Sequence, residues 1–102
     1  MNLEKEDMIE LLSNAIMFAR TGGFKVTAII SATGFTMIQE LDAENTFLSA
    51  NGSFASGHGC NSFDVDLDDF SEYKMYGTED MPGIIFYCGE KNTGSTVEIQ
   101  IG

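Results

Sequence analysis

Apolar residues in the first twenty positions recur every three or four residues. This stripe consists of Met8, Leu12, Ala15, Ile16 and Ala19. Such spacing places one apolar face along a helix. Acidic residues open the segment and Arg20 closes it, which agrees with the sign of the helix dipole. The pattern predicts an amphipathic helix over residues 3–20, ended by the glycines at 22 and 23.

From position 24 onward the apolar residues alternate with polar ones, which is the period of a strand. Residues 24–31 and 35–41 predict a hairpin around a turn at 32–34. Asn51-Gly52 predicts a second hairpin between residues 46–50 and 53–55. Residues 56–61 contain Gly57 and Gly59, and we expect a loop there. Alternation over 63–68 predicts a further strand. Residues 70–76 could form a strand or a short helix, and their two tyrosines favour the strand. Residues 84–88 and 96–101 predict a closing hairpin.

One helix, seven or eight strands and short connections predict a single α+β domain over residues 1–102. The chain offers no second long helix, so βαβ crossovers and a parallel sheet are excluded. We therefore expect an N-terminal amphipathic helix packed on a curved antiparallel sheet or a partly open barrel.

Composition limits the partners of this domain. Hydrophobic residues make up 43% of the chain, which is enough for a core, and the formal net charge is −11. Five cationic residues provide no basic stripe for a phosphate backbone, so we expect neither nucleic acid nor a membrane as partner. An acidic surface suits a basic protein partner instead.

The cysteines and the apolar segments bear on location. The chain has two cysteines, Cys60 and Cys88, fewer than disulfide-rich secreted domains carry. Its start shows no signal-peptide pattern, and its longest apolar stretches are too short to cross a bilayer. We expect a cytoplasmic protein with two reduced thiols, although the spacing leaves one disulfide open.

Residues that could carry chemistry are few. His58 is the single histidine, and a zinc site would need more imidazole or thiolate ligands. His58 and Cys60 have the residue types of a base and a nucleophile, but no third group is present to orient them. We interpret them as a loop histidine beside a partly buried thiol, and we expect no enzymatic activity and no metal site.

Carboxylates gather on one segment. Asp64, Asp66 and Asp68 fall on one face of the predicted strand, and Asp69 follows. A calcium-binding loop would require glycine where Asp69 stands. The pattern therefore predicts a solvated acidic face, whose mutual repulsion a basic partner would relieve.

The order of several short motifs resembles the cytosolic haem-utilisation carriers of the ChuX/HutX type. The resemblance covers roughly residues 25–102 and rests on the following segments: Thr27-Ala28-Ile29-Ile30, Gly52-Ser53-Phe54, Gly57-His58-Gly59 with Asn61, and the closing hairpin with Ile85-Phe86-Tyr87 and Val97 to Ile101. The chain departs from the family pattern at Asp64, Asp66 and Pro82, where that family tends to carry histidines.

The resemblance implies a curved antiparallel sheet with flanking helices, haem as the cofactor and a homodimer. A haem iron needs an axial donor, and the candidates by chemistry are His58, Tyr73, Tyr76 and Tyr87. Two hypotheses follow. The first is a small non-enzymatic protein that binds haem or another flat, apolar ligand. The alternative is an acidic module that engages a basic protein partner.

Overall fold

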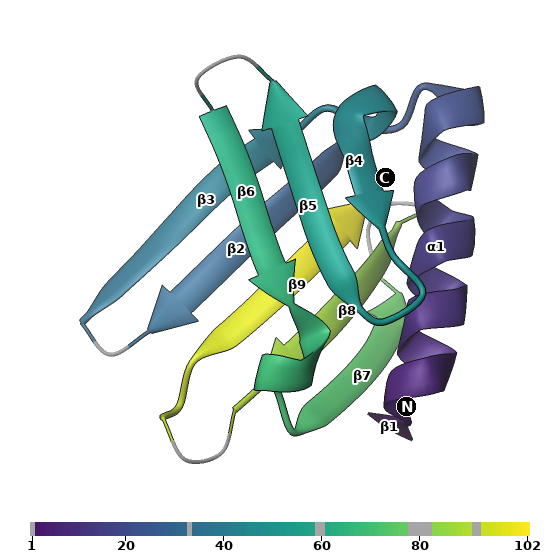
Figure 1. The fold of residues 1–102 in the computed structure, drawn as a ribbon. Coiled ribbons are helices and arrows are strands. Elements are labelled where there is room, and N and C mark those ends of the chain that lie inside the picture. Colours follow the sequence, from purple (N-terminus) through teal and green to yellow (C-terminus); the bar gives the residue numbers. More distant parts are fainter. Residues whose placement is uncertain (1, 33, 59–60, 78–82, 91–92) are drawn as a thin grey trace.

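The computed structural model describes residues 2–32, 34–58, 61–77, 83–90 and 93–102 (Figure 1). In this part of the chain one α-helix is followed by antiparallel strands and two short 3-10 helices. In chain order the elements are β1 (Asn2–Leu3), α1 (Lys5–Gly22), β2 (Val26–Ala32), β3 (Phe35–Leu41), η1 (Ala43–Asn45), β4 (Thr46–Leu48), β5 (Ser53–His58), β6 (Asn61–Asp66), η2 (Leu67–Asp69), β7 (Glu72–Gly77), β8 (Ile84–Gly89) and β9 (Thr96–Ile101).

Helix α1 confirms the helical stripe, since all five of its predicted residues are buried. Glu6 and Asp7 lie in the first turn and Arg20 in the last, as the helix dipole favours. Gly23 ends the helix in the left-handed conformation, with φ of 70°. The predicted start was wrong by two residues, because Leu3 belongs to β1 and pairs with Tyr73.

The larger sheet contains six strands in the order β1-β7-β8-β9-β2-β3. All neighbouring strands are antiparallel, as predicted. The predicted hairpins over β2–β3 and β8–β9 are present. β9 also pairs with β2, and this contact joins the β2–β3 hairpin to the β8–β9 hairpin in one sheet. The sheet stays open and does not close into a barrel.

A smaller sheet, β4-β5-β6, crosses in front of the larger one beside α1 (Figure 1). Two predictions were wrong here. Residues 56–58 and 61 belong to strands β5 and β6 rather than to a loop, because Ser56 and Gly57 continue the ladder with Phe63 and Ser62. Asp68 lies in η2 and not on a strand, because the carboxylate of Asp66 accepts the N–H of Asp68 and turns the chain.

The core lies between α1, the larger sheet and the smaller sheet. Helix α1 contributes its whole stripe, and β2, β8 and β9 contribute alternate residues. The largest side chains that are fully buried are Phe54, Phe86, Met8 and Leu12. These observations confirm the α+β class, with the N-terminal helix packed on an antiparallel sheet.

Candidate functional site

An apolar groove separates the C-terminal half of α1 from the nearby strands of the larger sheet. We call it the α1–β8 groove. Its volume is about 680 Å³, within the usual range for small-molecule sites. The described lining residues are Leu11, Asn14, Ala15, Phe18, Phe24, Met75, Gly83, Ile84, Phe86, Ile101 and Gly102.

One wall of the groove is built by the end of α1 and the residues just after it. Phe18 stacks on Phe24, with ring centroids 5.0 Å apart and planes inclined by 12°. This stack needs glycine at position 22, because a Cβ there would lie 2.5 Å from the Phe24 ring. The two glycines therefore have separate roles: Gly23 turns the chain at the end of the helix, and Gly22 leaves room for the Phe24 ring to stack on Phe18.

The groove is apolar and partly open to solvent. Phe18 is 62% exposed and Ile84 is 40% exposed, although both are large hydrophobic residues. Asn14 is the one polar side chain among the described lining residues, and none of their side chains is charged. The groove thus offers apolar contact and an amide, but no charged side chain for an ionic ligand.

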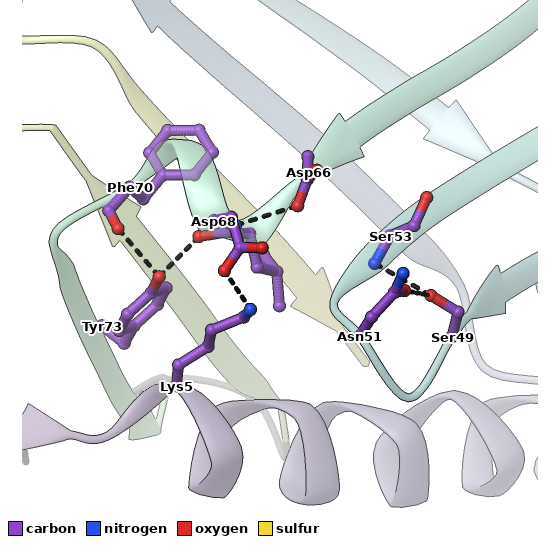
Figure 2. A network of polar contacts seen from close by, with 9 residues as sticks. Lys5, Ser49, Asn51, Ser53, Asp66, Asp68, Phe70 and Tyr73 are labelled. Atoms are coloured by element: carbon purple, nitrogen blue, oxygen red, sulfur yellow. Dashed lines mark hydrogen bonds and ion pairs between the residues drawn. The ribbon is translucent and has the colours of Figure 1, made fainter.

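Tyr73, a predicted haem donor, is a structural residue. Its hydroxyl lies within hydrogen-bond distance of the carbonyl oxygens of Leu67 and Phe70, at 2.8 Å from the latter (Figure 2). Burial, with smaller contributions from Cys88 and nearby carboxylates, raises the pKa of Tyr73. The phenol therefore keeps its proton and holds η2 against β7, so it does not point at a ligand.

Tyr76 and Tyr87 lie on the other face of the larger sheet. Successive side chains of a strand point to opposite faces, so Tyr76 faces away from the side of buried Tyr73. Tyr87 pairs with Lys74, whose ammonium lies 5.6 Å from the Tyr87 ring centroid. The Tyr76 hydroxyl donates to Glu98 at 3.3 Å, and burial followed by the Glu98 charge raises the pKa of Tyr76.

His58 ends strand β5 and pairs with Asn61. The position of the His58 side chain and the whole of Cys60 lie outside the described residues, so our interpretation of a histidine beside a partly buried thiol stays a prediction. Among the candidate donors that are described, Tyr73 is separated by the sheet from Tyr76 and Tyr87. None of these tyrosines lines the α1–β8 groove.

The predicted acidic face divides into two parts. Asp64 and Asp66 are exposed on β6, while Asp68 and Asp69 are exposed in η2. Asp66 caps the turn, and Asp68 forms an ion pair with Lys5 of α1 (Figure 2). Within the residues described, no cluster of three histidine, cysteine or carboxylate side chains could hold a metal ion.

A second hollow, of about 500 Å³, lies between the end of α1 and the segment after β3. Arg20 lines it, but its guanidinium donates to the carbonyl oxygen of Ala43 at 2.8 Å and to that of Thr46. The same group lies 4.9 Å from the Phe47 ring centroid. Arg20 thus joins α1 to η1 and β4. Lys25 also lines the hollow, and its ammonium lies 4.0 Å from the Glu40 carboxylate.

The α1–β8 groove escaped the sequence analysis. Its lining comes from α1, β7, β8 and β9, whose residues appear in the sequence as separate core positions. Met75 packs against the core and also lines the groove. One signal was present: Phe18 lies beside the helical stripe rather than within it.

Comparison of the chain with family models, curated proteins and solved structures found no match. The resemblance to haem-utilisation carriers therefore stays a prediction. No helix in the described part of the chain has both the length and the apolar character to span a membrane.

Proposed function

We propose that this protein is a small, non-enzymatic binding protein that holds a flat, apolar ligand in the α1–β8 groove. The observation that carries the proposal is the open apolar lining around Phe18 and Ile84. Large apolar side chains at 62% and 40% exposure cost hydration free energy in the empty protein. A ligand that covers them recovers part of that free energy, and the ring stack of Phe18 on Phe24 provides a flat contact surface.

The lining favours a neutral ligand. Haem carries two propionates, and no cation is present among the described lining residues to pair with them. Met75 contributes a thioether, which is a haem ligand in some electron-transfer proteins, but the three tyrosines lie elsewhere. Haem therefore remains a proposed ligand that we rank below an uncharged aromatic or polyene molecule.

The first experiment titrates the protein with Nile red, a flat and neutral dye whose fluorescence rises in apolar surroundings. Phe18→Ser is expected to weaken binding at least about tenfold, because it removes most of one aromatic wall. Met17→Ser is the matched control: Met17 is the preceding residue and is 61% exposed, but it does not line the groove. Equal binding by both variants would contradict the proposal.

A parallel titration with hemin separates the two ligand classes. A Soret shift that is lost in Met75→Leu or Phe18→Ser would support haem in this groove. A shift that is lost only in Tyr87→Phe would place haem on the opposite face of the sheet. If hemin leaves the spectrum unchanged while Nile red binds, the neutral ligand is favoured.

The alternative is an acidic module for a basic protein partner. The Asp66 carboxylate already caps a turn, and the Asp68 carboxylate already pairs with Lys5. These two carboxylates therefore have partners within the fold. Asp64 and Asp69 would then provide the charge for a partner. A pull-down at low and high salt tests this alternative, since screening releases a charge-driven partner. Partners retained by the Asp64→Asn, Asp69→Asn double variant would argue against it.

A further inference from the structure

Strand β3 forms an open edge of the larger sheet. It is seven residues long and pairs with β2 on one side only. In the described part of the chain, no backbone hydrogen bond joins residues 35–41 to any segment other than β2. Three large apolar side chains are exposed along it: Ile38 at 70%, Phe35 at 57% and Met37 at 45%. Long, apolar edges of this kind readily pair with another strand.

The backbone groups that face the free edge follow from one hydrogen bond in the ladder. The N–H of Gly102 donates to the carbonyl oxygen of Lys25 at 3.1 Å, so the odd-numbered residues of β2 bond β9. The even-numbered residues of β2 must then bond β3. Their partners on β3 are Phe35, Met37, Gln39 and Leu41. The N–H and C=O groups of the remaining β3 residues, Thr36, Ile38 and Glu40, therefore point to the free edge.

We propose that a second copy of this chain pairs with β3 edge to edge, around a two-fold axis at Ile38. In this antiparallel register Ile38 faces its own copy, and Thr36 faces Glu40 of the other chain. Each of these pairs brings outward N–H and C=O groups together, and each pair exchanges two hydrogen bonds. An axis at Ile38 pairs all three residues whose backbone groups lack a strand partner, whereas an axis at Met37 or Gln39 would pair only two of them.

Side-chain charge agrees with this register. Glu40 is the one acidic residue on β3, and its own copy would lie about 14 Å away along the strand. Its direct neighbour across the axis is Thr36, which is uncharged. Met37 faces Gln39, and Phe35 faces Leu41, so no like charges face each other directly.

The opposite edge of the larger sheet explains why edge pairing would stop at two chains. That edge is β1, which has two residues, Asn2 and Leu3. A strand of two residues cannot match the seven of β3, so the two edges of the larger sheet cannot pair head to tail into a filament. Pairing of β3 with its own copy uses both open edges at once and gives a closed dimer.

A cysteine trap tests the register. In a Cys60→Ser chain, Ile38→Cys would bring two thiols together across the axis, at a Cα separation of about 5.5 Å, which permits a disulfide. Met37→Cys is the matched control, because its copies would lie about 8 Å apart, too far for a disulfide. We expect mild oxidation to give a covalent dimer of the Ile38→Cys chain only. Equal cross-linking of both chains, or of neither, would overturn the proposal.

Sedimentation equilibrium tests the association itself in the unmodified chain. Ile38→Lys places two ammonium groups at the axis and is expected to raise the dissociation constant of the dimer at least about a hundredfold. Met17→Lys, at a similarly exposed position on α1, is expected to leave this constant unchanged. Circular dichroism should show both variants folded, since both side chains are exposed in the monomer. A chain that is monomeric at every concentration, or a dimer that survives Ile38→Lys, would refute the edge pairing.

Discussion

The two halves of helix α1 meet different surroundings. Near its start, the turn at Gly52 packs against Lys5 and Ile9, and the N–H of Leu67 donates to the Gly52 carbonyl at 2.9 Å. Near its end, Phe18 is 62% exposed beside an open groove. One amphipathic helix therefore contributes both to a closed core and to a candidate binding surface.

The difference arises from the smaller sheet. It crosses beside α1 (Figure 1), and its Gly52 turn packs against the start of the helix. None of the described residues that line the α1–β8 groove belongs to the smaller sheet. Gly52 permits this close approach, because its φ of 96° suits glycine and a Cβ there would lie 3.0 Å from the Lys5 side chain. Apolar residues of α1 that the smaller sheet covers belong to the core and stabilise the fold. Apolar residues of α1 that the smaller sheet leaves exposed are available for a ligand.

The largest expected effect contrasts two apolar residues of α1. Leu12→Ala should lower the free energy of unfolding by about 2–5 kcal/mol, because it leaves a cavity beneath a residue that is 1% exposed. Phe18→Ala should lower it by less than about 1 kcal/mol, since it loses mainly the stack on Phe24. Urea unfolding measures both. Similar losses in the two variants would mean that the groove is part of the core.

The next effect concerns pH and the closed core. Burial raises the pKa of the Cys88 thiol from its ordinary 9.0 to about 12. The folded chain therefore favours the protonated thiol, and this contribution is complete below pH 9 and is lost as the pH rises toward about 12. We expect the free energy of unfolding to fall by at most about 1.4 kcal/mol per pH unit in this window.

Urea unfolding at several pH values from about 8 to about 11 measures this effect, because the range begins below the ordinary thiol pKa of 9.0 and approaches the raised pKa of about 12. Cys88→Ala should be less stable throughout but should show a shallower decline above pH 9, because its core has no thiol to ionise. Identical slopes in the two chains would assign the alkaline loss to other groups, of which Tyr73 is the first candidate because burial also raises its pKa.

The smallest effect contrasts two tyrosine hydroxyls of β7. Tyr73→Phe should lower the free energy of unfolding by about 1–3 kcal/mol, since the Phe70 carbonyl loses the Tyr73 hydroxyl and the Leu67 carbonyl keeps only the N–H of Phe70. Tyr76→Phe should change it by less than about 0.5 kcal/mol, because its bond to Glu98 is exposed. Thermal or urea unfolding measures both, and a larger loss for Tyr76→Phe would reverse our assignment of the two faces.

Most elements could be predicted because their signals are local. The stripe of α1, its glycine stop and the hairpins around Gly34 and Gly52 each depend on residues close in sequence, and the structure confirms them. The errors fall where local signals compete. Gly57 looked like a loop residue, yet the ladder with β6 holds it in a strand. Asp68 looked like a strand residue, yet the Asp66 side chain turns the chain before it.

The candidate site could not be predicted in the same way. The four proposed haem donors were chosen for their chemistry, and the sheet places Tyr73 on the opposite side from Tyr76 and Tyr87. The α1–β8 groove depends on which apolar residues a second layer covers, and no spacing in the sequence encodes that coverage.

The amino-acid sequence by itself determined the class of the fold, the type and order of most elements and the surplus of negative charge, because periodicity, turn residues and charge are properties of neighbouring positions. The tertiary structure alone decided which apolar residues stay open, which carboxylates are used by the fold and which strand becomes the free edge. Those outcomes depend on how the two sheets and the helix pack, through contacts between residues far apart in the chain.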